Sequence, residues 1–286
     1  MKAWFTNSII SKSDWFSKRC GTAACIVLVT LTVGSSSLSA QATMISQPSF
    51  DHSLFDSLLH RYVANGMVDY DRFKHTPQFS AYLHRLARFD PSTLPETERL
   101  AFWINAYNAY TIELINEHDE RASVRDINKT FGFLKLHGPW SEPLATVGGH
   151  HYTLDDIEQR IIRPMFHEPR VHFALVCAAM GCPPLRSEAY TGATLSAQLD
   201  DQARIFLLES PAKNRVDVPG RKVYVSMIFN LYKDDFGGTD AAVGRFIARF
   251  YPSGPARELL DSGDFKLTET PYDWTLNSQA NAARHR

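Results

Sequence analysis

The sequence has few cysteines: four among 286 residues. Two of them, Cys20 and Cys25, lie in an N-terminal leader, so only Cys177 and Cys182 are expected in the mature protein. A framework of several disulfides is therefore excluded, and a chain of this length buries enough surface to fold without one. The chemistry left to the remaining pair is a structural disulfide, a redox couple, a thiol nucleophile or a metal ligand.

The mature sequence also has no excess of positive charge. The leader holds four basic residues and one acidic residue, which leaves 26 basic and 30 acidic side chains and a net charge of −4. A negative net charge does not attract nucleic acid or an anionic membrane, so neither is predicted as a partner. Metal ligands at paired spacing are missing too. His137, His150 and His151, with Glu158, show no H-x-x-x-H pattern, and we predict no metal and no cofactor.

The N-terminus lacks a hydrophobic run long enough for a comfortable membrane span. Residues 21–34 are apolar and uncharged, whereas a spanning helix needs about 20 residues. Basic residues precede this run, and Ala40-Gln41-Ala42 follows it as a small-x-small cleavage site. We therefore predict a signal peptide over residues 1–42 and an exported domain over residues 43–286. It would be periplasmic or secreted, without stable membrane insertion after cleavage; an uncleaved anchor is the alternative.

Hydrophobic periodicity predicts many helices and few strands. The strongest helix covers residues 95–117, where apolar residues from Leu100 to Ile115 occur on every face, so we expect it to be buried in the middle of the fold. Thr153-Leu154-Asp155-Asp156 resembles a capping box that opens a helix ending before Pro164. Further helices are expected over residues 50–64, 78–88, 194–209, 228–235, 241–251 and 256–261.

Strands are expected in only a few places. Residues 170–177 are apolar and predict a buried strand, and residues 216–218 and 223–225 flank a Pro-Gly turn as a hairpin. The fold class that follows is α+β: a mostly helical single domain, with its core at about residues 50–277, a small sheet and a buried central helix.

Cys177 and Cys182 flank a short loop that contains Gly181. A loop this tight can bring two Cα atoms within the roughly 7 Å that a disulfide requires, and an oxidising compartment favours the bridge. The other interpretation makes Cys177 a nucleophile at a strand end, with His172 as the nearest base. Positions five apart on a regular strand face opposite sides, so His172 reaches Cys177 only if the strand ends early or bulges.

Three further polar residues are site candidates. Asn105 and Asn108 share one face of the central helix, and buried carboxamides need hydrogen-bond partners. They either tie down a crossing loop or orient a substrate or a catalytic His. Glu158 and Arg163 are five apart on one helix and are poor partners for each other, so each is interpreted as a solvated or loop-fixing charge, with a catalytic role for Glu158 as the alternative.

Several motifs, correctly ordered over residues 50–277, resemble the domain of unknown function 547 family (DUF 547). They are Ala101-Phe102-Trp103-Ile104-Asn105-Ala106-Tyr107-Asn108-Ala109, Leu154-Asp155-Asp156-Ile157-Glu158, His172 to Cys177 with Gly181 to Arg186, Ser226-x-Ile-Phe229 with Asp235-Phe236, and Tyr272-Asp273-Trp274. The resemblance implies no agreed activity, although glutaredoxin-like domains joined to some relatives hint at thiol chemistry. Many relatives carry His where this chain has Gln159, which puts an activity that depends on that His in doubt.

The leading hypothesis is a thiol-dependent acyl or amide hydrolase or transferase. Its catalytic candidates are Cys177, His172, Asn105, Asn108 and Glu158, and its substrate is a small molecule, a peptide or a component of the cell envelope or extracellular space. One alternative is a non-catalytic binding or scaffold module with a structural Cys177–Cys182 disulfide. The other is a dithiol redox protein, and whether the chain is an enzyme stays open.

Overall fold

The computed structural model describes residues 48–127 and 138–284, which lie in one compact unit of the chain, Ser46–Arg286. Its helices are α1 (Ser53–Tyr62), α2 (Tyr70–Lys74), α3 (Pro77–Arg88), α4 (Glu96–Glu117), α5 (Arg163–Phe166), α6 (Leu195–Leu208), α7 (Ile228–Leu231), α8 (Asp240–Ala248), α9 (Pro255–Ser262) and α10 (Gln279–Arg284). The 3₁₀ turns are η1 (Pro91–Thr93), η2 (Val124–Asp126), η3 (Pro139–Ser141), η5 (Pro169–Phe173) and η6 (Lys233–Phe236), and η4 (Asp156–Ile162) is a π-helix. No helix in these described ranges is both long and apolar enough to cross a membrane.

The strands are short and form three small sheets. They are β1 (Val63–Ala64), β2 (Met67–Val68), β3 (Ala145–Val147), β4 (His150–Tyr152), β5 (Arg215–Asp217), β6 (Lys222–Val225) and β7 (Lys266–Glu269). The predicted hairpin is confirmed as the antiparallel pair β5–β6, and β7 joins β6 in parallel. Helices therefore dominate and sheets have two or three strands, which confirms the predicted α+β, mostly helical fold.

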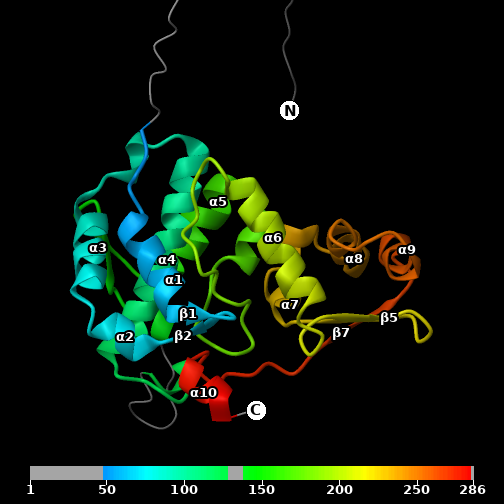
Figure 1. The fold of residues 1–286 in the computed structure, drawn as a ribbon. Coiled ribbons are helices and arrows are strands. Elements are labelled where there is room, and N and C mark those ends of the chain that lie inside the picture. Colours follow the sequence, from blue (N-terminus) through cyan, green and yellow to red (C-terminus); the bar gives the residue numbers. More distant parts are fainter. Residues whose placement is uncertain (1–47, 128–137, 285–286) are drawn as a thin grey trace, which may run out of the picture. The chain divides into compact units, whose positions relative to one another are not determined.

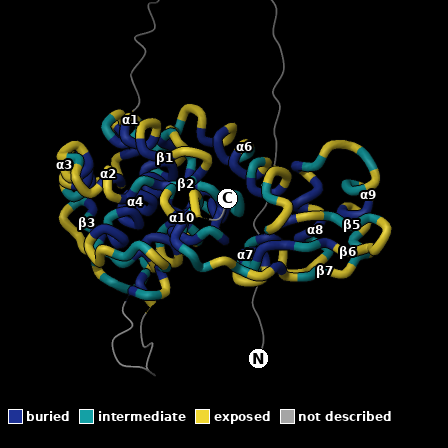
Figure 2. Tube along the Cα trace, turned by 60° about the horizontal axis from the view of Figure 1, so that its bottom comes forward, coloured by how far each residue is buried: buried dark blue, intermediate teal, exposed yellow. Residues whose placement is uncertain are grey.

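The central helix α4 is buried along most of its length, as its unbroken apolar pattern predicts. Glu96 and Glu98 stand in its first turn, where carboxylates favour the positive end of the helix dipole. From Leu100 to Ile112 every side chain is buried, and Figure 2 shows α4 coloured mostly as buried. Because α4 has no solvent face over these turns, its polar side chains must find partners within the fold.

Two hydrophobic cores stand side by side. The larger is built mainly from α1 to α4, and the smaller from α6 to α9 with β6, as Figure 1 shows. The segment after α5 passes between them: Val171 and Leu175 belong to the larger core, whereas Phe173 packs in the smaller one. This segment carries His172 and leads into Cys177, so the predicted site lies where the two cores meet.

The predicted strand over residues 170–177 is wrong. Residues Pro169–Phe173 form a 3₁₀ turn, started by Pro169 and by the Glu168 carboxylate, which accepts the N–H of Arg170 at 3.0 Å. The residues from Val171 to Val176 are buried as expected, but burial of a short apolar run does not separate a strand from other structure. The side chain of Asn108 on α4 bonds to the backbone of Ala174 and Val176, where a neighbouring strand would have supplied the hydrogen bonds.

The predicted helix after Thr153 begins as expected but does not stop at Pro164. The capping box is present, because Thr153 and Asp156 exchange reciprocal side-chain-to-backbone hydrogen bonds of 2.9 and 3.0 Å. The chain then forms a π-helix, η4, whose last N–H at Arg163 bonds to the carbonyl of Glu158. Pro164 therefore stands in the first turn of α5, where a proline without an N–H is tolerated, and the helix continues to Phe166.

Candidate functional site

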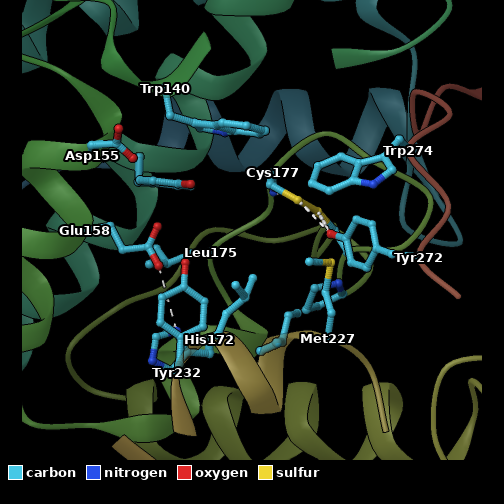
Figure 3. Close-up of a pocket in the computed structure, with 15 residues that line it drawn as sticks. Trp140, Asp155, Glu158, His172, Leu175, Cys177, Met227, Tyr232, Tyr272 and Trp274 are labelled. Atoms are coloured by element: carbon cyan, nitrogen blue, oxygen red, sulfur yellow. Dashed lines mark hydrogen bonds and ion pairs between the residues drawn. A yellow bond between two sulfur atoms is a disulfide. The ribbon is translucent and has the colours of Figure 1, made fainter. Parts of the chain in front are cut away.

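A pocket of about 160 Å³ opens where the two cores meet (Figure 3). Its lining side chains are Tyr107, Trp140, Asp155, Glu158, His172, Leu175, Cys177, Cys182, Pro183, Met227, Ile228, Leu231, Tyr232, Tyr272 and Trp274. They come from α4, η3, the start of η4, η5 and the cysteine loop that follows it, α7 with its flanking residues, and the C-terminal segment. Distant parts of the chain therefore converge here. The pocket holds both cysteines and a cluster of titratable groups.

Cys177 and Cys182 form a disulfide with their Cα atoms 6.1 Å apart. The two sulfurs have different surroundings: Cys177 is partly exposed, whereas Cys182 is 1% exposed. The Sγ atom of Cys182 accepts the N–H of Cys177 at 3.1 Å. The hydroxyl of Tyr272 lies 3.0 Å from Cys177 Sγ and 3.1 Å from Cys182 Sγ, and it is the donor because a disulfide carries no proton.

His172 is held between two carboxylates beneath the pocket. Its Nε2 lies 2.7 Å from Asp235 Oδ2, and its ring stacks on Tyr232 with centroids 3.9 Å apart. Burial lowers the pKa of His172 to about 4, against the opposing effect of Asp235. Arg163 donates two hydrogen bonds to Asp235, at 2.6 and 2.8 Å, and lowers the pKa of that carboxyl. His172 is therefore neutral near pH 7 and donates Nε2–H to an ionised Asp235, which leaves a lone pair on Nδ1.

Glu158 is buried rather than solvated, and so the interpretation of it as a surface charge is wrong. Burial raises the pKa of Glu158, partly offset by hydrogen bonds from the hydroxyls of Tyr232 and Tyr107. Burial also raises the pKa of both tyrosines, so they remain protonated donors. Glu158 Oε1 lies 3.8 Å from Nδ1 of His172, beyond hydrogen-bond range, and this contact is drawn in Figure 3.

Asn105 and Asn108 do not line the pocket. The carboxamide of Asn108 donates to the carbonyl of Ala174 at 2.9 Å and accepts the N–H of Val176 at 3.0 Å. Asn105 binds the backbone of Tyr190 in the same two-way manner, at 2.8 and 2.9 Å. Each side chain thus holds a crossing segment of backbone, as the first interpretation of the pair describes, and Asn108 holds the segment that leads directly into Cys177.

The histidines considered for a metal site do not surround one. His150 and His151 are exposed on β4, and His137 lies outside the described residues. In the ranges that the structure describes, no three His, Cys, Asp or Glu side chains come together as metal ligands.

Two residues that contact the site candidates were not predicted: Tyr272, which lines the pocket, and Asp235, which bonds to His172 from outside it. Asp235 orients His172, and Tyr272 contacts both sulfurs. Both belong to the family motifs quoted above, which was the only available signal, since each is more than 60 residues from its partner in the sequence. Gln159 accepts a hydrogen bond from Arg163, so this departure from many relatives adjoins the same network.

The family model described as "Protein of unknown function, DUF547" matches residues 91–207, which confirms the resemblance. The matched range includes α4, Glu158, His172 and both pocket cysteines, and it ends before Asp235 and Tyr272. No curated protein and no solved structure matches the chain.

Proposed function

We propose that the protein is a dithiol–disulfide oxidoreductase with Cys177 and Cys182 as its redox pair. The observation that carries this proposal is the asymmetry of the pair. Cys177 is partly exposed in the pocket wall, whereas Cys182 is buried and its sulfur accepts the backbone N–H of Cys177. The Tyr272 hydroxyl lies within reach of both sulfurs and can serve whichever becomes the thiolate. Donors that stabilise a thiolate make that sulfur the better leaving group, and a purely structural bridge needs none.

The reaction is an exchange that oxidises a substrate dithiol, or two monothiols. A substrate thiolate attacks Cys177 Sγ, the bond to Cys182 breaks, and its electron pair moves to Cys182 Sγ as a thiolate that solvent protonates. A second substrate thiolate then attacks the substrate sulfur of the mixed disulfide and releases Cys177 as a thiolate. Two electrons pass from substrate to protein, one S–S bond breaks and one forms.

Lys213 adds a positive charge at the backbone of Cys182. Its Nζ donates to the carbonyl of Cys182 at 2.5 Å, and burial lowers its pKa to about 8. A lysine with this pKa is still mostly protonated at neutral pH, so it contributes to stabilising a thiolate at Cys182. We also propose that the exchange takes place after export, in the periplasm or outside the cell, because the leader-like N-terminus fits that route and disulfides persist there.

The reduction potential of the pair tests the proposal. The full protein is equilibrated in glutathione or dithiothreitol redox buffers, quenched in acid, unfolded and alkylated, and the alkyl groups are counted by intact mass. We expect a midpoint above roughly −300 mV, the range of exchangeable disulfides. A midpoint below that value would identify an inert bridge and favour the non-catalytic binding or scaffold module.

A second candidate is the thiol-dependent acyl or amide hydrolase or transferase, acting on an envelope or extracellular substrate. The buried His172 of the pocket wall, oriented by Asp235, favours it, because an oriented neutral His is a competent base. It ranks second because no hydrogen bond joins His172 to Cys177 in the described residues.

If the hydrolase or transferase is correct, a soft electrophile should alkylate the reduced protein at neutral pH. Cys177→Ser should abolish that labelling and leave the melting temperature nearly unchanged. Equal labelling of native and unfolded protein would contradict this candidate.

A further inference from the structure

One end of the pocket presents two hydrogen-bond acceptors with no donor between them. His172 Nδ1 belongs to a side chain that is 1% exposed and has no hydrogen-bond partner among the described residues. Its lone pair faces Glu158 Oε1 at 3.8 Å. Buried acceptors are rarely left unpaired, so this geometry is complementary to a ligand group that carries several N–H donors.

The charge of the pocket points to the same kind of group. The acidic side chains that line it are Asp155 and Glu158, and within the described residues no lysine or arginine does so. Asp155 is exposed at the rim, where the Ser141 hydroxyl donates to it at 2.7 Å. Aromatic faces in the wall, such as that of Trp140, add attraction for a cation. A cation is therefore favoured over an anion, and a cation bound beside Glu158 would oppose the burial that raises the pKa of that carboxyl.

The acidic end and the disulfide lie on opposite sides of one small space. Figure 3 shows Asp155 and Glu158 on one side, and Cys177 with Tyr272 on the other. The volume of about 160 Å³ is close to that of a cavity of roughly 150 Å³ known to take a ligand the size of benzene. A ligand that reaches both ends is therefore a small molecule with a cation at one end and a sulfur-reactive group at the other.

We infer that the thiol substrate is a low-molecular-weight aminothiol, with its ammonium group at Glu158 and His172 and its thiol at Cys177. This inference rests on the proposed redox function and names its substrate class. The ammonium group donates to Glu158 Oε1 and to Nδ1 of His172, which holds the thiolate beside Cys177. Two aminothiols then become one disulfide while the Cys177–Cys182 bond is reduced.

The test compares three thiols of similar size as reductants of the full protein: cysteamine, 2-mercaptoethanol and 3-mercaptopropionate. Each second-order rate constant is divided by the thiolate fraction, so that differences in thiol pKa are removed. We expect cysteamine to react at least tenfold faster than 3-mercaptopropionate, with 2-mercaptoethanol between them. The preference should shrink in 1 M salt, because the Debye length falls to about 3 Å.

Variants identify the residues that bind the ammonium group. Asp155→Asn and Glu158→Gln should each reduce the ratio of the cysteamine to the 3-mercaptopropionate rate to threefold or less, and the exposed Asp155 keeps the test decisive if the buried Glu158 variant fails to fold. Asp264→Asn makes the same change in net charge on an exposed side chain outside the pocket, and it should leave the ratio unchanged. Equal corrected rates for all three thiols would overturn the aminothiol inference and leave the redox function standing. A disulfide that none of the thiols reduces would overturn both.

Discussion

The hydroxyl of Tyr272 is the one side-chain donor close to both sulfurs within the described residues, at 3.0 and 3.1 Å. A hydrogen bond to a thiolate is stronger than one to a neutral disulfide sulfur, because the acceptor is charged. Tyr272 therefore stabilises the reduced pair more than the oxidised pair. Removing its hydroxyl should make the disulfide harder to reduce.

We expect Tyr272→Phe to lower the reduction potential of the Cys177–Cys182 pair by about 20–30 mV, which corresponds to roughly 1 kcal/mol. The measurement is the same redox titration as for the parent protein. The ring still fills the wall beside Gly181, so the melting temperature should change little. An unchanged or higher potential would mean that the hydroxyl does not act on a thiolate.

Glu113 on α4 provides a pH test at a single residue. Burial and the neighbouring Glu117 raise the pKa of Glu113 to about 7, from an unfolded value near 4.5. The folded protein therefore binds this proton more tightly than the unfolded chain. The contribution to stability is fully present below pH 4.5 and is lost as the pH rises to about 7.

Glu113→Gln should accordingly raise the free energy of unfolding at pH 8 by about 1 kcal/mol, a value reduced to allow for solvent screening of a partly exposed group. At pH 4.5 the substitution should have almost no effect, because the parent side chain is then protonated in the folded state. Urea unfolding of the two proteins at both pH values measures the difference. A gain of equal size at the two pH values would show that charge is not its cause.

Among the secondary-structure elements, α4 holds the site in place through Asn108, although neither Asn105 nor Asn108 lines the pocket. Asn108 bonds to the carbonyl of Ala174 and the N–H of Val176, and so it holds the segment leading to Cys177. Asn105 makes the equivalent pair of bonds to Tyr190, which lies away from the pocket wall. The two side chains are therefore a matched pair: both bond to backbone in the same way from one helix, and only Asn108 holds the segment that leads to the disulfide.

Asn108→Ala should destabilise the protein by about 2–4 kcal/mol, because it leaves two buried backbone groups unpaired, and it should also shift the reduction potential of the cysteine pair. Asn105→Ala should lose a similar amount of stability and leave the potential unchanged. Denaturant unfolding and redox titration of both variants give the comparison. An equal shift of potential in both would indicate general loosening rather than positioning of Cys177.

The helix α4 is predictable from the sequence, whereas its long-range contacts are not. Its apolar residues on every face predict a buried helix, and the structure contains one at Glu96–Glu117. The strand expected over residues 170–177 is absent because the bonds of Asn108 replace those of a sheet, and periodicity carries no sign of such a long-range side-chain contact. His172, Glu158 and Cys177 do line one pocket. Tyr272 in its wall and Asp235, which bonds to His172, make contacts across the chain that spacing cannot reveal.

In the molecule as a whole, the disulfide closes a very small loop beside two large hydrophobic cores. The sequence separation between its cysteines is five residues, so the chain-entropy relation gives a stabilisation of only about 2 kcal/mol. The two cores, rather than this bridge, account for most of the buried apolar surface. Opening the disulfide should therefore leave the fold intact.

We expect reduction to lower the free energy of unfolding by about 2 kcal/mol or less, with unchanged far-ultraviolet circular dichroism. Urea unfolding with and without dithiothreitol tests this, and Cys177→Ser in oxidising buffer serves as a bridge-free control. Loss of the fold on reduction would instead identify the bridge as a structural staple. That outcome would argue against both catalytic candidates.

The C-terminal segment straps the cysteine loop from the far end of the chain. Met180 and Gly181 donate their N–H groups to Thr275 and Asp273, at 2.7 and 2.8 Å, and this pairing places Tyr272 at the sulfurs. Since Tyr272 follows Cys182 by 90 residues, a growing polypeptide contains both thiols long before it contains the group that tunes them. A chain cut short in this interval keeps the cysteine pair but lacks the Tyr272 hydroxyl, so the surroundings of the two sulfurs are completed only when synthesis reaches the C-terminal segment.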